Sequence, residues 1–128
     1  MDRRRFEQLA EEAFDALPEE LLGHVDNVVF VVEDWPDAET LAEMGIESPS
    51  DLLGLYQGIS LAERSVTAGG SLPDRILLYQ RPIEHWARVD GLDVYDVIYD
   101  TLLHEIGHHF GLDEEDLARL EGWEPEQG

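Results

Sequence analysis

The segment between positions 94 and 110 contains the pattern that most restricts how this chain can fold. Apolar residues recur at every fourth position along it, at Val94, Ile98, Leu102, Ile106 and Phe110. An α-helix has about 3.6 residues per turn, so this spacing places the apolar side chains in one stripe along a helix. We therefore predict a long helix that opens near Asp93 and is anchored in the hydrophobic core. Polar residues within this helix are held on a rigid element.

Residues 104–108 of the predicted helix have the sequence His-Glu-Ile-Gly-His. Because a helix turns by about 100° per residue, side chains four positions apart lie almost above one another, and His104 and His108 can bind the same metal ion. Glu105 is rotated away from this pair, in a position suited to accept a proton from a metal-bound water. The pattern is typical of zinc sites. We predict that His104 and His108 are Zn²⁺ ligands and that Glu105 is the general base.

A catalytic zinc ion usually has three protein ligands and one position open to water, so a third ligand is required. Gly111 follows His108 by three positions and tolerates a positive φ, which lets the helix end and the chain turn back toward the metal. Glu114, three positions further, is the predicted third ligand. Other acidic side chains remain as alternatives: Asp113, Glu115 and Asp116 in the same cluster, and Glu121 and Glu124 later in the chain. The cluster is also typical of the capped first turn of a helix.

Three stretches of the chain are informative together: HEIGHHFGLDEEDL from His104, LLGLYQGI at residues 52–59, and LPDRILLYQRPIE at residues 72–84. In these stretches the chain resembles the small bacterial zincin-like metallopeptidases, and the resemblance extends over most of its length. It implies a minimal zincin fold of class α+β, in which a short mixed β-sheet packs on an N-terminal helix and on a long active-site helix. It also implies zinc bound by the two motif histidines and an acidic residue after the glycine. That residue is often Asp in the family, whereas this chain has Glu114.

The motif and the resemblance together predict a zinc-dependent metallopeptidase that hydrolyses peptide bonds through a zinc-activated water, with Glu105 as the general base. The alternative is a zinc-bearing module that binds a peptide or protein without turnover. Its basis is size, because a chain of 128 residues, expected to form a single domain over residues 1–128, has little surface with which to orient a scissile bond. In both cases the expected partner is a peptide or a protein.

The chain is strongly acidic, with 30 Asp and Glu residues against 8 Lys and Arg residues and a formal net charge of −22. A field of this sign repels nucleic-acid phosphates and anionic membrane surfaces, so we expect neither partner unless the protein mimics a nucleic acid. Basic or neutral peptides are favoured instead. Cysteine is absent, so a metal must be bound by His and carboxylate side chains. The first residues lack an apolar signal-peptide core and no stretch approaches a membrane span, so we expect a cytoplasmic protein, whose oligomeric state is left open.

The rest of the chain predicts short elements around the motif helix. Residues 6–17 have helical spacing and residues 27–32 are typical of a buried strand, whereas residues 33–51 are expected to form a surface excursion with a short helical turn near 40–44. Strands at 55–59 and 75–79 are expected to pair as a hairpin through a turn at 68–70, and residues 82–84 to begin a polar connection. By analogy with zincins, residues 75–79 are expected to offer a free edge to an extended peptide.

Other residues whose side chains could take part in chemistry are assigned structural roles. His109 lies about 140° around the helix from His104 and is expected to pack or to support the site rather than to bind metal. Tyr79 is expected to pack within its strand, with stabilisation of an oxyanion as its alternative role. His24 and His85 are expected to be ordinary surface histidines. Trp35, Trp86 and Trp123 are expected to be core or rim anchors, and Trp86, which is next to His85, is also a candidate to line a pocket.

Overall fold

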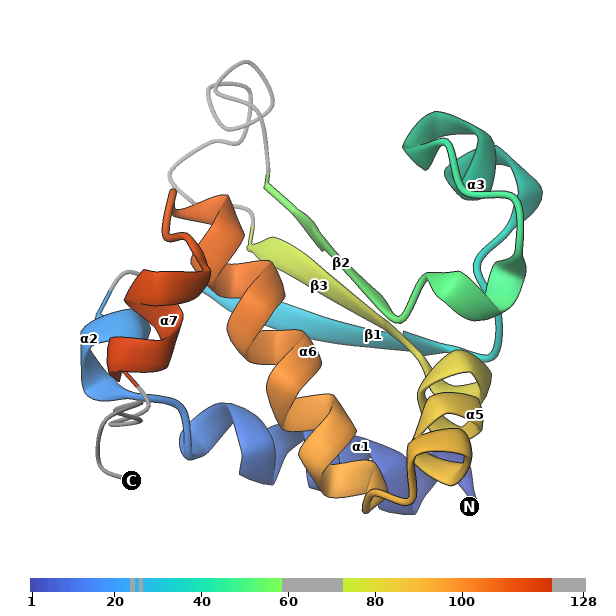
Figure 1. Ribbon diagram of the computed structural model, residues 1–128, viewed down its shortest axis with the longest axis horizontal. Coiled ribbons are helices and arrows are strands. Elements are labelled where there is room, and N and C mark those ends of the chain that lie inside the picture. Colours follow the sequence, from blue (N-terminus) through green and yellow to red (C-terminus); the bar gives the residue numbers. More distant parts are fainter. Residues whose placement is uncertain (24, 26, 59–72, 121–128) are drawn as a thin grey trace.

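Figure 1 shows the computed structural model, which describes residues 1–23, 25, 27–58 and 73–120. The helices are α1 (Arg3–Asp15), α2 (Glu19–Leu22), α3 (Ala38–Met44), α5 (Gln80–Asp90), α6 (Val94–His109) and α7 (Glu114–Leu120). The strands are β1 (Val28–Glu33), β2 (Gly54–Gln57) and β3 (Asp74–Tyr79), and a 3₁₀ turn, η1, spans Pro49–Asp51. The predicted α+β class is confirmed by this combination of helices with a mixed sheet.

The described strands form one sheet in the order β1-β3-β2. β3 is parallel to β1, with Phe30 opposite Ile76, and antiparallel to β2, with Tyr56 opposite the same residue. The predicted pairing of the strands near residues 55–59 and 75–79 is therefore confirmed. The turn predicted at residues 68–70 lies outside the described residues.

The free edge predicted at residues 75–79 is wrong, because β3 is the central strand and is paired on both sides. The physical reason lies in the apolar run of this strand. Its residues Ile76, Leu77, Leu78 and Tyr79 are all buried, so the strand is covered on both faces. A strand with two buried faces is typical of the interior of a sheet that has packed layers on each side. Among the described strands, β1 and β2 are the outer ones.

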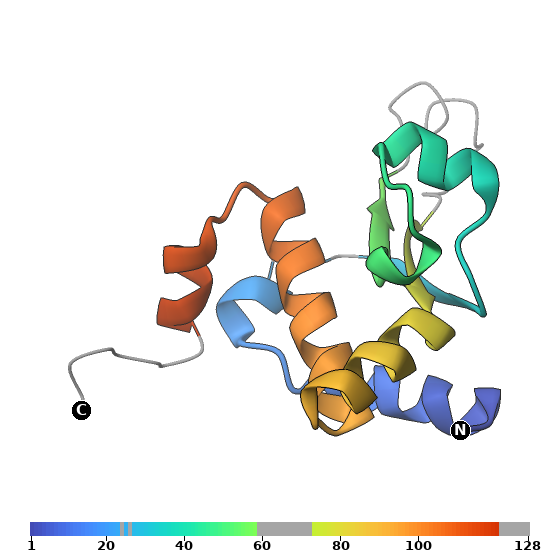
Figure 2. The ribbon, with the colours of Figure 1, turned by 45° about the vertical axis from the view of Figure 1, so that its right-hand side comes forward.

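Alternate residues of β3 pack on opposite faces of the sheet. Ile76 and Leu78 point to the face covered by α1 and α6, which lie together in Figures 1 and 2. The main core on this face also contains Phe6, Leu9 and Ala13 of α1 and Ile98, Leu102 and Ile106 of α6. Leu77 and Tyr79 point to the other face and pack in a second, smaller cluster with Leu52, Leu41 and Ile46. The motif helix is thus attached to one face of the sheet only.

The stripe predicted on the motif helix is confirmed, since Ile98, Leu102 and Ile106 are 0% exposed. The helix begins after the N-cap residue Asp93, as expected from the sequence. Near the expected positions the structure also has α1, β1 and, within the acidic excursion, α3. The buried face of α6, the helix that carries the predicted site, was therefore predicted correctly from the sequence.

α5 corrects one prediction, because residues 82–84 belong to a helix of 11 residues and not to a polar connection. Ile83 and Ala87, four positions apart, are buried in the main core. Pro82 lies in the first turn of this helix, where a missing N–H costs no intrahelical hydrogen bond, so the proline does not end the helix. Gly91 ends the helix with a φ of 68°.

Gly54, at the start of β2, allows this strand to lie directly against α6. A Cβ atom at this position would lie 2.7 Å from Thr101 Cγ2 and 3.1 Å from the carbonyl oxygen of Leu77. Contacts under 3.0 Å are essentially never made by real Cβ atoms, so the approach of the strand to the helix requires glycine. The close approach brings Tyr56, two residues further along β2, to the part of α6 that carries the His-Glu-Ile-Gly-His motif.

We predict that Gly54→Ala lowers the free energy of unfolding by about 1–3 kcal/mol, because the added methyl group must displace Thr101 or the backbone of β3. The measurement is urea denaturation followed by circular dichroism. The matched control is Gly23→Ala, at a position with a right-handed helical φ of −62° and no atom nearer than 3.5 Å to the added Cβ. An unchanged midpoint in Gly54→Ala, or an equal loss in Gly23→Ala, would contradict the close approach.

Candidate metal centre

The two histidines of the motif lie on the side of α6 that faces away from the core. Ile106, between them in the sequence, is 0% exposed, whereas the side chains of His104 and His108 are 29% and 51% exposed. The buried stripe therefore fixes the helix and leaves both imidazoles on its accessible face. The Nδ1 atom of His104 donates a hydrogen bond of 2.8 Å to the carbonyl oxygen of Asp100, one helical turn earlier. This contact fixes the orientation of the ring.

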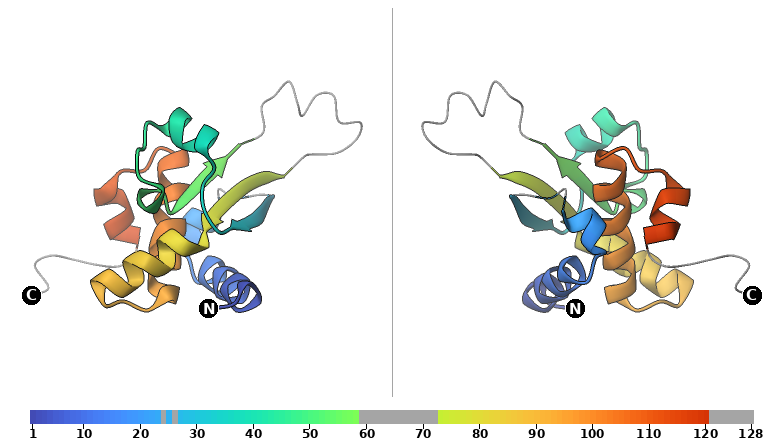
Figure 3. Two further views of the ribbon diagram at one scale, coloured as in Figure 1. Left: turned by 90° about the vertical axis from the view of Figure 1, so that its right-hand side faces the viewer. Right: turned by 90° about the vertical axis from the view of Figure 1, so that its left-hand side faces the viewer.

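α7 returns along α6 and lies on the side of α6 that faces away from the strands, as the views in Figures 2 and 3 show. The reversal occurs at Gly111, which has a φ of 85°, as predicted for the residue that ends the helix. The N–H of Leu112 donates to the carbonyl oxygen of Gly107 at 2.9 Å and closes the turn. The Leu117 side chain then packs on Gly107, at the place where any Cβ of residue 107 would collide with it. The motif glycine thus provides the contact surface for α7.

This reversal places Glu114 between the two imidazoles. Its Oε1 atom lies 2.7 Å from Nε2 of His104, and its Oε2 atom lies 3.0 Å from Nε2 of His108. The three side chains predicted as metal ligands are therefore brought into direct contact by elements on both sides of Gly111. The contacts are made by the ring atoms that a histidine uses most often to bind zinc when its Nδ1 is engaged elsewhere.

The neighbouring acidic residues have other partners. Asp113 accepts a hydrogen bond of 2.9 Å from the N–H of Asp116 and so caps α7, and Asp116 contacts Arg119. Glu115 lies 3.7 Å from Arg119. The expectation that this cluster also forms the capped first turn of a helix is confirmed. The two remaining alternatives for a third ligand, Glu121 and Glu124, lie outside the described residues.

The electrostatics of His104 indicate a site for positive charge. Both of its ring nitrogens face oxygen atoms, the Asp100 carbonyl at Nδ1 and the Glu114 carboxylate at Nε2. A neutral imidazole has only one N–H, so both contacts are favourable only when the ring is protonated or when a cation lies at Nε2. Burial lowers the pKa of His104, but the hydrogen bonds to Asp100 and Glu114 outweigh it and raise the pKa above 6.5. The contact with His104 lowers the pKa of Glu114.

These side chains fit a zinc ion by their chemistry, although among the described residues no three metal-binding side chains are already arranged around a single point. Two imidazoles and a carboxylate form a known donor set for catalytic zinc. Two ligands of one tetrahedral zinc ion lie about 3.4 Å apart, so the contacts of 2.7 and 3.0 Å need to lengthen by roughly half an ångström. The Glu114 side chain is 69% exposed, so most of its surface faces solvent, where such a movement is possible.

Glu105 lies on the side of α6 that faces β2. Burial raises the pKa of its carboxyl group, and the main-chain N–H of Tyr56, which donates a hydrogen bond to that group, partly opposes the rise. Tyr56 is itself well supported, since its hydroxyl donates to Asp74 Oδ2 at 2.7 Å and its ring stacks on His109 with centroids 3.9 Å apart. His109 therefore has a packing role beside the site, as expected from its position on the helix.

Two contacts of the site were not identified from the sequence. Asp100 lies four positions before His104, a spacing that could have marked it as a partner on the same face of the helix. Tyr56 contributes through its main chain, which no residue pattern reports. Tyr79 has the predicted packing role and not the alternative one, because it is 1% exposed and points to the face of the sheet opposite α6.

The described residues thus define an α+β fold in which α6 brings two imidazoles into contact with a carboxylate of the following helix and holds Glu105 on its side facing β2. A family profile described as zincin-like metallopeptidase matches residues 25–123, and the chain belongs to this family. The resemblance inferred from the three sequence stretches is confirmed. The fold is accordingly a minimal zincin-like one, and membership implies zinc binding as a family property.

A solved structure has a similar fold. It is a conserved hypothetical protein from Thermo thermophilus, which is 25% identical in sequence and superimposes with a TM-score of 0.52 over 85% of this chain and 94% of the other. The description of that protein names no activity. No curated protein matches the chain. None of the described helices is long and apolar enough to cross a membrane.

In metal-free protein, we predict that Glu114→Gln lowers the pKa of His104, because the carboxylate that stabilises the protonated ring is lost. The measurement is a pH titration of the His104 ring protons by NMR in the presence of a chelator. Glu115→Gln is the matched control. It removes the same charge at the next residue, whose side chain is paired with Arg119 and not with a histidine.

The contact between His104 and Glu114 also contributes to the stability of the folded protein, and this contribution depends on pH. The pKa of His104 is raised in the folded state, so the contribution of the contact is complete below an ordinary pKa of 6.5 and is lost as the pH rises through the folded-state value. Equal titration curves for His104 in the wild type and in Glu114→Gln would show that the two side chains do not interact in solution.

Proposed function

We propose that this protein is a zinc-dependent metallopeptidase that hydrolyses peptide bonds, with His104, His108 and Glu114 as the zinc ligands. The observation that carries the proposal is the contact of one Glu114 carboxylate with both Nε2 atoms, at 2.7 and 3.0 Å. Three side chains of the correct types are gathered there, and Glu105 is held beside them. Membership of a metallopeptidase family supports the same conclusion.

Zinc, when bound, supplies a Lewis acid for the carbonyl oxygen of the scissile bond and for the attacking water. The residues of the chain supply the remaining functions. The Nδ1 hydrogen bond to Asp100 keeps the lone pair of neutral His104 on Nε2, which faces Glu114. Glu105 takes the proton from the attacking water and passes it to the amide nitrogen of the leaving amine. Burial raises the pKa of Glu105, and this rise makes its conjugate acid a better proton source near neutral pH than an exposed glutamate would be.

β2 is the element best placed to orient a peptide. The N–H of Tyr79 donates to the carbonyl oxygen of Leu53 at 2.9 Å, so the main-chain groups of alternate residues from Leu53 onward face β3. The main chain of Tyr56 therefore faces the outer side of the sheet, where its N–H meets Glu105. An extended peptide that pairs along this side would pass next to Glu105. The outer side of β2 replaces the edge that was expected at residues 75–79.

The expected partners are peptides or proteins, and the net charge of −22 favours basic or neutral ones over nucleic acids and anionic membranes. A second candidate function is capture of such a partner without turnover. The observation that favours it is the openness of the site, because the side chains of His108 and Glu114 are 51% and 69% exposed. A site with little enclosure orients a scissile bond weakly and excludes little water.

We predict that Glu105→Gln keeps about one zinc ion per chain but lowers the rate of peptide hydrolysis by about 10²- to 10⁴-fold, because it removes the general base and leaves the ligands in place. His104→Ala should lose both zinc and activity. Zinc is measured by elemental analysis of protein purified without added metal, and activity with a library of fluorogenic peptides. Zinc retained at full occupancy in His104→Ala would refute the ligand assignment.

Wild-type activity should also fall as the pH is lowered toward about 6, where protons compete with zinc for imidazoles whose ordinary pKa is about 6.5. The measurement is the pH profile of hydrolysis, recorded together with zinc content at each pH. The same peptide library separates the two candidate functions. If the wild type and Glu105→Gln bind peptides equally and neither cleaves them, the protein is a zinc-bearing binding module.

A further inference from the structure

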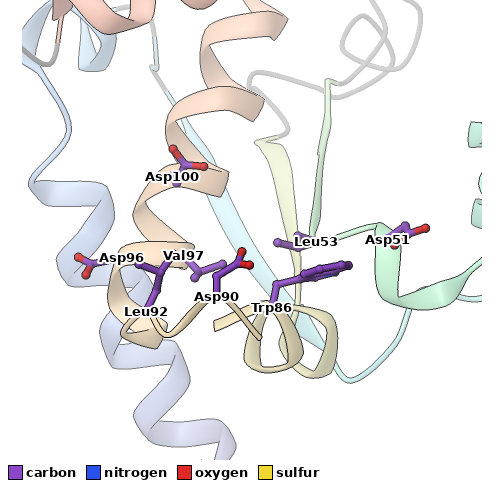
Figure 4. Close-up of a pocket in the computed structure, with 8 residues that line it drawn as sticks. All are labelled: Asp51, Leu53, Trp86, Asp90, Leu92, Asp96, Val97 and Asp100. Carbon is purple, nitrogen blue, oxygen red and sulfur yellow. The ribbon is translucent and has the colours of Figure 1, made fainter. Parts of the chain in front are cut away.

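A pocket of about 690 Å³ opens beside the N-terminal half of α6 (Figure 4). Its lining comes from η1, α5 and α6, from the segment after η1 and from the connection between α5 and α6: Asp51, Leu53, Trp86, Asp90, Leu92, Asp96, Val97 and Asp100. This volume is within the range of pockets that bind small organic ligands. Trp86, which the sequence marked as a candidate pocket residue, does line a pocket.

Asp100 joins this pocket to the metal centre. Its side chain contributes to the pocket lining, while its carbonyl oxygen accepts the hydrogen bond from Nδ1 of His104 and its Oδ1 atom lies 3.3 Å from the same nitrogen. Leu53 also belongs to the lining, and it immediately precedes β2, the strand proposed to orient a peptide. A peptide held along β2 would therefore have one side chain next to the pocket. This is the placement that a specificity site for such a peptide requires.

The lining combines an apolar base with negative charge. Leu53, Val97 and the indole of Trp86 provide apolar surface, and in Figure 4 the Asp90 carboxylate points up between Val97 and Trp86. The indole N–H is occupied, since it donates to the Ser50 carbonyl at 2.7 Å, so the ring is fixed and its remaining surface is apolar. Four of the eight lining residues are aspartates, and none of the lining residues that the structure describes is basic.

This combination suits an organic cation better than a metal ion. A metal needs several carboxylates that converge on one point, and no such group exists among the described residues. The aspartates are instead distributed around apolar surface and an aromatic ring. A basic side chain matches that distribution, because its aliphatic stem packs on apolar groups while its charged end contacts an aromatic face and carboxylates.

We propose that this pocket binds the side chain of a basic residue, arginine in particular, in the peptide that occupies the metal centre. The inference rests on the proposed function for the peptide itself, but binding in the pocket needs no turnover. Arginine is favoured over lysine because its planar guanidinium stacks on an indole and contacts separate carboxylates at the same time. Asp90 and Trp86, both on α5, supply a carboxylate and the indole, and Asp100 connects the pocket to His104.

The test uses the Glu105→Gln protein, which is proposed to retain zinc and not to cleave. Two probes, N-acetyl-L-arginine amide and N-acetyl-L-citrulline amide, have nearly the same shape but differ in charge. Each is titrated at 0.15 M salt, about physiological ionic strength, and binding is followed by the NMR signal of the Trp86 indole N–H. We expect the arginine probe to bind about tenfold more tightly than the citrulline probe, with shifts centred on Trp86 and Leu53.

A general attraction to the charge of −22 would also favour the arginine probe, so matched variants are required. Asp90→Asn should reduce the preference for arginine by about threefold or more, whereas Asp15→Asn, at an exposed position in the last turn of α1, should leave it unchanged. Equal affinity for the two probes, or equal losses in Asp90→Asn and Asp15→Asn, would overturn the pocket assignment.

Peptide cleavage and probe binding give separate outcomes for the peptidase and for the pocket. Zinc-dependent cleavage of library peptides without any preference for a basic residue would overturn the pocket and leave the peptidase in place. Selective binding of the arginine probe at Trp86, in a protein that cleaves no peptide, would support the pocket and contradict the peptidase.

Discussion

Burial of one face of α6 is the interaction on which the rest of the structure depends. Ile98, Leu102 and Ile106 are fully enclosed between α1 and the sheet, and together they contribute several kcal/mol of hydrophobic stabilisation. The same residues leave only one side of the helix accessible, and on that side lie His104 and His108. The stability of the core and the geometry of the candidate site are therefore two consequences of one helical repeat. A helix anchored in this way holds the two imidazoles in defined positions relative to the core.

Close packing at two glycines brings the other parts of the candidate site to this helix. Gly54 lets β2 approach α6 and brings the Tyr56 N–H to Glu105, while Gly107 lets Leu117 pack on the helix and brings Glu114 to the histidines. Neither approach leaves space for a Cβ atom. Glu105, the proposed general base, and Glu114, the proposed third ligand, are thus positioned from opposite sides of one helix by contacts between backbone and side chains. In a chain of 128 residues, these contacts position both side chains with few additional segments.

The sequence predicted those features that depend on local spacing. The motif helix, its Asp93 cap, the Gly111 reversal and the position of Glu114 all follow from residues close to one another along the chain. Features that depend on which elements meet were predicted less well. The pattern of apolar residues in a strand does not indicate whether both of its edges are paired. The free edge expected on β3 was wrong for this reason. The polar connection expected from Pro82 was wrong because the effect of a proline depends on its position in the helix, which only the structure reveals.

The acidity of the chain acts on the site mainly through its nearest carboxylates. Charges further apart than about 8 Å are largely screened at physiological ionic strength, so most of the net charge of −22 affects solubility and the approach of partners. Asp100 and Glu114 are different, because each lies within 3.3 Å of a ring nitrogen of His104. Their charges stabilise any cation at Nε2, whether a proton or a metal ion. Protons and zinc therefore compete for one position, and the carboxylates that favour zinc at neutral pH also favour the protonated ring in metal-free protein.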